Sequence, residues 1–473
     1  MSLTQFIHAV EWSFLAYFAA ISAAYLGQNL VAVSSIRRYL RSSSIDDHDP
    51  AYSTVNLPIS LVVPAYNEST SIVTSIRALL QLEYSDFELV VVNDGSTDDT
   101  LEKLIESFEL YPYPEAYQKQ VPCKPVKATY RSARYKNLRV VDKENGGSKA
   151  DASNAGINLC RNPLVTIVDA DGILQRNALT RAVRPFLEDP NTVAAGGTIR
   201  IANGCKLREG FLEEVGLPRN FLPLMQVLEY LRAFLFGRMG WEPIGAVLIV
   251  SGAFGVFRRT TLIEVGGYNP HAVGEDMELV VRIHRRMKQL RRRYRIAFIP
   301  DPVCWTDAPE TLKDLGGQRI RWQHGLGQAL MLNKWLLMNP RGGTVSWLAI
   351  PFYVLFELLG PLIEAVGLLF FLFMAIAGLI AWPEAGIFLA LSLSLGLLLS
   401  ISAIMLEEFS FSMYRKPREL ARLYLAAVVE NFGYRQLTVW WRLKGLYRWI
   451  TGGAHKWETI TRSANVSTSG DKA

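Results

Sequence analysis

The chain has 473 residues, of which 50 are Lys or Arg and 44 are Asp or Glu, so its formal net charge is +6. Half of the residues are hydrophobic and only 20% are charged, a composition that excludes disordered and fibrous proteins. The chain is more apolar than an ordinary cytosolic enzyme of this size, and the excess is concentrated in segments near its two ends.

The first apolar segment, about residues 12–36, has no charged side chain, and three arginines beginning with Arg37 follow it. Its length is sufficient to cross a bilayer, and a signal peptide would carry its basic residues before the apolar stretch instead. Because basic flanks stay in the cytoplasm, we predict a transmembrane helix here with its N-terminus outside. This helix forms a unit of residues 1–41, and residues 42–56 are predicted to be a linker.

Residues 57–341 alternate short β-branched runs with helical patterns and are predicted to form one cytoplasmic domain. Runs such as Ile59–Val63 and Phe87–Val92 are followed by helical patterns, and the pattern Lys149–Leu159 leads to the run Leu164–Val168. A strand–helix–strand rhythm with continuously hydrophobic runs indicates an α/β domain whose parallel sheet is covered on both faces.

Acidic residues recur where the predicted strands end, which is the edge at which such sheets bind ligands. Tyr66 and Glu68 follow the first run, Asp94 follows the second, and Asp169 and Asp171 follow Leu164–Val168. Any one of these acidic residues could merely cap a helix, but three acidic loops at one edge favour a shared site. No glycine-rich dinucleotide or ATP-type phosphate loop follows a strand, so those ligands lack support.

Asp169 and Asp171 leave their strand two residues apart, so both carboxylates point to the same side. Such a pair can share Mg²⁺ or Mn²⁺, and these cations also bind substrate phosphates, so the pattern predicts a metal-bridged nucleotide diphosphate. The pair alone is weak evidence, because two exposed turn carboxylates would look the same. The loop Gly146–Lys149 strengthens the prediction by adding glycine amides and a cation at a helix start, where phosphate is favoured.

Three further motifs follow along the chain: a small-residue turn at Ser251–Gly255, an amphipathic helix opened by Gly274-Glu275-Asp276, and the helical stretch Gln318–Trp322. The last two have simpler explanations. Asp276 could be a first-turn carboxylate stabilised by the helix dipole, and the Arg and Trp of the last motif could lie at lipid headgroups.

Two more charge-free segments, Ala365–Pro383 and Ala385–Leu406, predict a transmembrane hairpin over residues 342–406. Its spans are expected at about 352–382 and 385–406, with an outer turn at Trp382–Glu384. Residues 407–473 are basic and aromatic, and they include apolar stretches interrupted by charges that are costly in lipid. We therefore predict interfacial or re-entrant helices there, followed by a cytoplasmic C-terminal tail.

Taken together, these motifs resemble the membrane-bound, inverting family 2 glycosyltransferases, which include the synthases of cellulose, chitin, hyaluronan and poly-N-acetylglucosamine. The resemblance covers about residues 57–340, and Glu275-Asp276 followed by Gln318-x-x-Arg321-Trp322 is typical of polymerising members. It implies a GT-A-type, Rossmann-like mixed sheet inserted between transmembrane helices of a multi-pass protein of the bacterial inner membrane. The sequence departs from many members at Gly274, where they have Thr.

The resemblance also implies roles on the donor side of the reaction. The residues that would hold the uridine and diphosphate of a UDP-sugar are Tyr66, Glu68, Asp94 and Lys149. Asp169 and Asp171 would bind the same nucleotide through Mg²⁺ or Mn²⁺.

On the acceptor side, the resemblance implies that Asp276 is the general base, with Glu275 beside it, and that Gln318, Arg321 and Trp322 hold the diphosphate and the acceptor sugar. The chemistry is consistent with these roles. A single displacement at the anomeric carbon needs a base on the acceptor hydroxyl and positive charge on the leaving UDP, and it turns an α-linked donor into a β-linked product.

Two functions remain open at this point: a processive synthase that extends and exports a β-linked polysaccharide, and a non-processive transferase that adds one sugar to a membrane lipid. A non-enzymatic scaffold would have lost the acidic residues, and none is missing. The expected partners are the UDP-sugar, a polysaccharide or lipid-linked acceptor and the bilayer, with a second copy or accessory secretion subunits as further candidates. The four cysteines and six histidines have no disulfide or zinc spacing, and the basic residues indicate an anionic membrane surface instead of nucleic acid.

Overall fold

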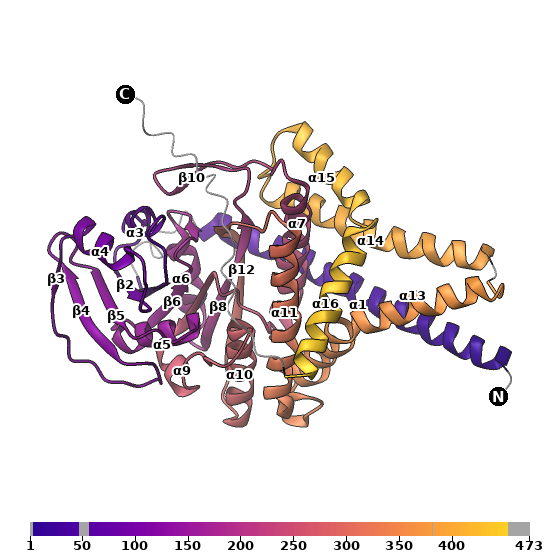
Figure 1. The fold of residues 1–473 in the computed structure, drawn as a ribbon, viewed down its shortest axis with the longest axis horizontal. Helices are drawn as coiled ribbons and strands as arrows, with labels where there is room; N and C mark the ends of the chain where they lie inside the picture. Colours follow the sequence, from indigo (N-terminus) through magenta and orange to yellow (C-terminus); the bar gives the residue numbers. More distant parts are fainter. Residues whose placement is uncertain (1–2, 47–55, 381, 453–473) are drawn as a thin grey trace.

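The computed structural model describes residues 3–46, 56–380 and 382–452, and a ten-stranded sheet lies at its centre. The strands of this sheet are β1 (Ile59–Ala65), β2 (Phe87–Asn93), β3 (Leu110–Pro112), β4 (Val126–Ser132), β5 (Leu138–Lys143), β6 (Leu164–Val168), β7 (Ile173–Leu174), β8 (Thr192–Ile201), β11 (Phe254–Arg258) and β12 (Arg295–Thr306). Their order is β3-β4-β5-β2-β1-β6-β11-β8-β12-β7. The sheet occupies one side of the molecule, and long helices project from the other side (Figure 1).

Four neighbouring strands, β5, β2, β1 and β6, are parallel, as the alternating pattern predicted. The helices that follow β1, β2 and β5 are α3 (Ile72–Leu79), α4 (Thr100–Ser107) and α5 (Lys149–Leu159), and the bounds of α5 and β6 are those predicted. Parallel strands need such crossover connections, because a tight turn can join only antiparallel neighbours.

A purely parallel sheet, which the alternation by itself suggested, is wrong, and the mixed sheet implied by the family resemblance is confirmed. The strand β11 runs antiparallel between β6 and β8, with Phe254 opposite Val168. Its amino end therefore lies beside the carboxyl end of β6. This direction brings the small-residue turn before β11 to the edge of the sheet where Asp169 and Asp171 emerge.

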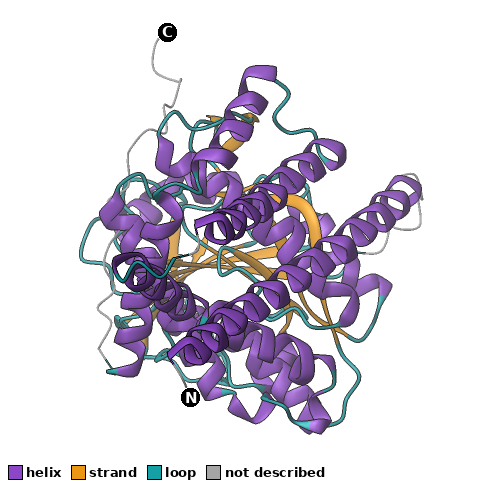
Figure 2. Cartoon of the chain, turned by 90° about the vertical axis from the view of Figure 1, so that its right-hand side faces the viewer, coloured by secondary structure: helices purple, strands orange, loops and turns teal. Residues whose placement is uncertain are grey.

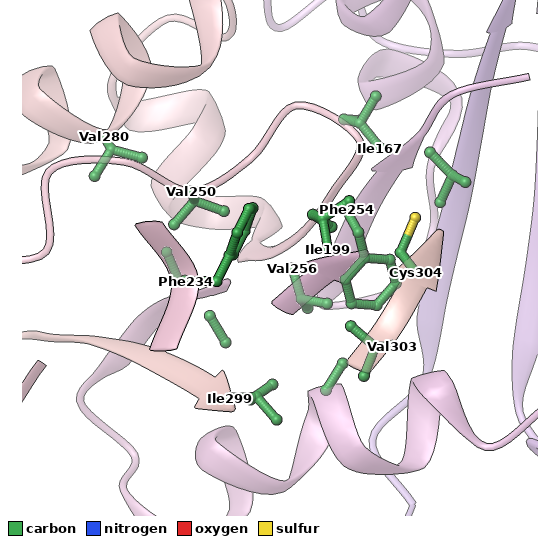
Figure 3. Close-up of a cluster of buried hydrophobic side chains, with 14 of the residues drawn as sticks. Ile167, Ile199, Phe234, Val250, Phe254, Val256, Val280, Ile299, Val303 and Cys304 are labelled. Atoms are coloured by element: carbon green, nitrogen blue, oxygen red, sulfur yellow. The ribbon is translucent and has the colours of Figure 1, made fainter. Parts of the chain in front are cut away.

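A continuous apolar core lies beneath this edge. Ile167 of β6, Ile199 of β8 and Phe254 of β11 are fully buried there, together with Val303 of β12 and with Val280 of α10 (Glu275–Gln289). Figure 3 shows these side chains converging on one cluster. Burial of each large apolar side chain contributes roughly 1.5–3 kcal/mol, so the cluster is a firm support for the loops above it.

Two long helices, α11 (Leu312–Leu332) and α16 (Tyr434–Ile450), run side by side between the sheet and the projecting helices (Figure 1). Glycines allow their close approach. A Cβ at Gly316 would lie 2.7 Å from Trp441 Nε1, and one at Gly445 would lie 2.6 Å from the Ile320 carbonyl oxygen. Larger residues at these positions would separate the two helices. Seen after a 90° turn, helices cover the near face of the molecule and the strands pass behind them (Figure 2).

The projecting helices are α1 (Leu3–Asp46), α13 (Gly360–Ile376) and α14 (Trp382–Ser410). In the described part of the chain, two helices are long and apolar enough to cross a membrane, Ile7–Arg41 and Ala385–Ser410. The pair Val345–Leu358 and Gly360–Ile376, which is bent by 42°, would make a third if it is a single span. The predicted bilayer position of these helices, and the cytoplasmic position of the sheet domain, stay predictions.

Some predicted boundaries differ from the helices in the structure. The outer turn was placed at Trp382–Glu384, but α14 begins at Trp382, and its first turn accommodates Pro383 because first-turn N–H groups need no helical acceptor. The helix α1 includes residues 42–46 of the predicted linker. The rest of that linker, from 47 to 55, and the tail 453–473 lie outside the described residues. The basic C-terminal region forms α15 (Pro417–Val429) and α16, and neither is among the candidate spans.

The bend before α13 has a local cause. Pro361 has no N–H, so the carbonyl of Glu357 loses its helical donor. Gln323 Nε2 of α11 donates to this carbonyl at 3.1 Å, and the guanidinium of Arg442 of α16 donates to it as well. Tyr25 of α1 donates its hydroxyl to the Glu357 carboxylate at 2.7 Å. The bent segment therefore joins α1, α11 and α16.

Candidate active site

A chain of contacts links the loops at the carboxyl edge of the sheet. Lys149, the first residue of α5, donates from Nζ to the Asp169 carboxylate and to the Gly252 carbonyl, the latter at 2.7 Å. The N–H of Gly252 donates to Asp276 Oδ2 at 3.0 Å. Residues from α5, the loop after β6, the turn before β11 and the start of α10 thus meet at one place, as expected for Lys149, Asp169 and Asp276.

The charges in this cluster influence one another. Burial lowers the pKa of Lys149, but Asp169, Glu275 and Asp276 act against it, and the net pKa is raised, so Lys149 is a cation at neutral pH. Burial and the neighbouring Asp276 raise the pKa of Glu275 to about 7. The site therefore combines a stable positive charge with a carboxyl group that exchanges its proton near neutrality.

Asp169 and Asp171 are both partly exposed in the loop after β6. Across the described ranges, no cluster of three or more His, Cys, Asp or Glu residues could hold a metal ion. Two carboxylates fit Mg²⁺ or Mn²⁺, which keep waters and take further oxygens from a substrate diphosphate. The donor set does not fit a closed structural zinc site.

Asp94 lies buried beneath the loop Gly146–Lys149. It accepts the N–H of Gly146 at 3.0 Å and pairs with Lys143, whose Nζ also lies 2.6 Å from Asp151. Burial raises the pKa of Asp94, and Lys143 offsets part of that shift. Lys143 was not among the predicted site residues, although a lysine that ends a hydrophobic run was the available signal. Its ammonium group, fully buried between two carboxylates, fixes Asp94 against the glycine loop.

Tyr66 and Glu68 follow β1 on the same edge. The Tyr66 side chain is 43% exposed, whereas the Glu68 carboxylate accepts the Ser71 hydroxyl at 3.1 Å at the start of α3. The N–H of Asn67 donates to Ser96 Oγ at 3.0 Å, so the loops after β1 and β2 are joined. Tyr66 is accessible to a ligand at this rim, and the binding roles of both residues stay predictions.

The helix α11 has two opposite faces with different contacts. Gln318, Arg321, Gly325 and Gln328 follow the spacing of one face, whereas the glycines that contact α16 lie on the other. Gly325 contacts the start of α10, since a Cβ there would lie 2.8 Å from Gly274 N. Gln318 and Arg321 therefore belong to the face of α11 that contacts the helix carrying Glu275 and Asp276.

The contact between these two helices also explains the departure from the family pattern at Gly274. A Cβ at Gly274 would lie 3.2 Å from Gly325 Cα, which is tighter than most contacts of a real Cβ. A threonine would therefore push α11 away unless Gly325 moved. The glycine allows two backbones to meet where many members of the family that the sequence resembles have a threonine.

Trp322 is exposed on one side and supported on the other. Its side chain is 45% exposed, and the Arg319 guanidinium lies 4.4 Å from the ring centroid. Arg319 is buried and pairs with Glu229 of α7 (Phe221–Leu231). Nearby, Gln318 Oε1 is buried without a hydrogen-bond partner in the described part of the chain. The exposed Trp322 ring offers a flat apolar surface, which is suited to stacking against a pyranose ring.

Comparison with known families agrees with this arrangement. Residues 60–119 match "Glycosyl transferase family 2", and residues 121–325 match "Glycosyltransferase like family 2". The chain therefore belongs to the family 2 glycosyltransferases. Residues 268–416, which contain α10 and α11, match "Chitin synthase", so within the family the matches point to polysaccharide synthases.

Two relatives with known names have low sequence identity to this chain. The poly-β-1,6-N-acetyl-D-glucosamine synthase of Staphylococcus aureus (strain COL) is 27% identical over 285 residues, which are 60% of this chain and 58% of the relative. The same enzyme of Staphylococcus epidermidis is 25% identical over 303 residues, which are 62% of this chain and 63% of the relative. The chain thus spans less than two thirds of the length of these relatives.

A solved structure covers more of the chain. A mannosyltransferase from Pyrobaculum calidifontis in complex with GDP-Man and Mn²⁺ aligns with 93% of this chain and 99% of its own, with a TM-score of 0.53 and 18% identity. At this identity the likeness concerns the fold alone, which is a glycosyltransferase fold.

Proposed function

We propose that this protein transfers sugar units from a UDP-sugar to the growing end of a β-linked polysaccharide, on the cytoplasmic side of a membrane. The observation that carries the proposal is the contact of α10 with α11 at Gly274 and Gly325, since it puts Glu275-Asp276 next to the face of α11 that carries Gln318 and Arg321. The synthase names of the relatives support a polymer acceptor.

Asp276 is proposed as the general base. Its Oδ2 accepts the Gly252 N–H at 3.0 Å, and its Oδ1 accepts the N–H of the next residue, Met277, at 2.8 Å. These two bonds hold the carboxylate in one orientation and leave lone pairs for an acceptor hydroxyl. As the hydroxyl oxygen bonds to the anomeric carbon, its proton passes to Asp276 and the bond to UDP breaks.

The leaving diphosphate acquires negative charge in this step. Lys149 at the start of α5 and Arg321 of α11 are proposed to bind it, and the planar Arg321 fork suits two phosphate oxygens. A divalent cation on Asp169 and Asp171 would neutralise the diphosphate further. Lys149 would then exchange part of its contact with Asp169 for phosphate oxygens.

Trp322 and Gln318 are proposed to hold the acceptor sugar. The exposed Trp322 ring provides an apolar face for the sugar. Gln318 lies one helical turn before Trp322 on α11, so its amide group is near this face.

A product analysis tests the proposal. Membranes containing the protein are incubated with a panel of labelled UDP-sugars and Mg²⁺ or Mn²⁺, and the products are separated by size and by solubility in organic solvent. We expect a polymer from one UDP-sugar. A single sugar on an extractable lipid would show that the acceptor is a lipid and would overturn the synthase proposal.

A further inference from the structure

The side chain of Gln328 binds the loop that enters α10. The role that we infer for Gln328 rests on the function proposed above. Its Oε1 accepts the Val273 N–H at 2.8 Å, and its Nε2 donates to the His271 carbonyl at 3.0 Å. Both halves of one amide are therefore used on the three residues that precede Gly274. The proposed base, Asp276, lies only three residues after Val273.

The two hydrogen bonds act together with the glycine contact. Gly325 lies three residues before Gln328 on the same face of α11, and its backbone abuts Gly274. Farther along, Asn333 Nδ2 at the end of α11 lies 3.5 Å from Glu278 Oε1 in the first turn of α10. The start of α10 is thus attached to α11 before, at and after the glycine contact.

The same helix is also attached on its opposite side. Gln323 Oε1 accepts Arg442 Nε of α16 at 2.9 Å, while Gln323 Nε2 donates to the carbonyls of the bent segment at Glu357 and Leu358. A short piece of α11 therefore connects the projecting helices, the proposed acceptor residues and the proposed base. A displacement of α11 would carry the start of α10 with it.

We propose that Gln328 is a positioning residue that keeps Asp276 at a set distance from the acceptor site of α11. In this role it touches neither substrate. When an acceptor sugar occupies the face that carries Gln318 and Arg321, the base is already aligned with the hydroxyl to be deprotonated. Loss of the two hydrogen bonds leaves the donor site intact but frees the loop 271–273, so the base is misaligned and the bond-forming step slows.

The test uses Gln328→Met in the full-length chain, because methionine keeps the length of the side chain and removes both hydrogen bonds. The rate of UDP release is measured against UDP-sugar concentration. We expect kcat to fall by about 10-fold to 100-fold, the range caused by small misplacements of reacting groups, with KM for the UDP-sugar changed less than about twofold. Gln328→Glu keeps the acceptor oxygen for the Val273 N–H and should recover part of kcat.

Gln436→Met is the matched control. Gln436 makes the same pair of bonds at the start of α16, accepting the Gly433 N–H at 2.8 Å and donating to the Asn431 carbonyl at 3.2 Å. This variant should lose similar thermal stability and keep kcat within about twofold. An unchanged kcat in Gln328→Met, a rise in KM alone, or an equal loss of kcat in both variants would overturn the proposal. If Gln328→Met does not accumulate, Gln328→Glu is compared with Gln436→Met in its place.

Measurement of UDP release separates this inference from the proposed function. If the wild-type product is a single sugar on a lipid, the synthase proposal fails, but the comparison of kcat with KM still decides the role of Gln328. If the wild-type chain makes polymer and Gln328→Met matches it in kcat, only the positioning role fails.

Discussion

The N–H of Gly252 donates to Asp276 Oδ2 at 3.0 Å, and these two residues are 24 positions apart in the sequence. The bond exists because β11 runs antiparallel to β6, which places the turn before β11 at the edge where the parallel strands end. The same turn receives Lys149 through the Gly252 carbonyl. Gly252 therefore contacts both Asp276, the proposed base, and Lys149, the cation beside the predicted metal ligands.

The first prediction concerns the base. In Asp276→Asn the side-chain oxygen can still accept the Gly252 N–H, but the amide cannot take a proton. We expect kcat to fall by about 100-fold or more while binding of the UDP-sugar is retained. Initial rates of UDP release and titration with UDP would measure the two effects. Activity in this variant comparable to that of the wild type would contradict the assignment.

The second prediction concerns the two carboxylates after β6. Asp171→Asn and Asp169→Asn should each raise the Mn²⁺ concentration needed for half-maximal activity by about tenfold, which is about 1.4 kcal/mol per lost ligand. Asp169→Asn also removes the negative charge paired with Lys149, and it should lower the unfolding free energy by about 1 kcal/mol, a modest value because Asp169 is partly exposed. Activity and thermal unfolding would be measured for both. An unfolding free energy of Asp169→Asn equal to that of the wild type would contradict this contribution of Asp169.

The third prediction concerns the buried lysine under the glycine loop. Lys143→Met leaves Asp94 and Asp151 buried without their cation, so the unfolding free energy should fall by about 3–5 kcal/mol. Thermal unfolding in detergent measures this, and the exposed Lys136→Met is the control that should change little. The variant should regain stability as the pH is lowered, because protonation neutralises its buried carboxylates. A small loss of stability would mean that water reaches this cluster.

The fourth prediction concerns acid pH. His284 of α10 is buried, donates from Nε2 to the Val247 carbonyl at 2.8 Å and accepts the Tyr294 hydroxyl at Nδ1, and burial lowers its pKa from 6.5 to about 4. In the unfolded chain His284 therefore takes up a proton below about pH 6.5, whereas in the folded chain it does so only below about pH 4. The contribution to stability is complete above pH 6.5 and should be lost by up to about 3 kcal/mol as the pH falls to 4.

His284→Gln tests this sign. The midpoint of thermal unfolding would be followed from pH 7 to pH 4 in both proteins. The variant is expected to be less stable at pH 7 and to show a shallower decline on acidification. Parallel curves for the two proteins would exclude His284 as a source of the acid sensitivity.

The fifth prediction concerns membrane orientation. Single cysteines at Gln5 and at Leu379, which lies between α13 and α14, should react with an impermeant maleimide in intact cells. Cysteines at Lys136 and Thr451 should react only after permeabilisation, because the sheet domain and α16 are predicted to be cytoplasmic. The four native cysteines are replaced by Ser in each variant. Labelling of Lys136→Cys in intact cells would contradict the predicted orientation.

Much of the sheet and many of the site loops could be predicted from local sequence. The parallel core, α5 and β6 follow from hydrophobic runs and helical periodicity, which depend on neighbouring residues only. The acidic residues after β1, β2 and β6 could be assigned to one edge by geometry alone, because parallel strands end on the same side. The family motifs then suggested catalytic and binding roles, which hydrophobic periodicity cannot indicate.

The sequence by itself therefore determined which segments become parallel strands and which side chains reach their common edge. Only the tertiary structure decided that β11 turns back to bring Gly252 to Asp276, that Lys143 is buried between two carboxylates, and that Gln328 holds the entrance to α10. The physical reason is that these contacts join residues of different helices, strands and loops. Each depends on how helices and strands pack, and packing leaves no periodic signal in the residues that meet.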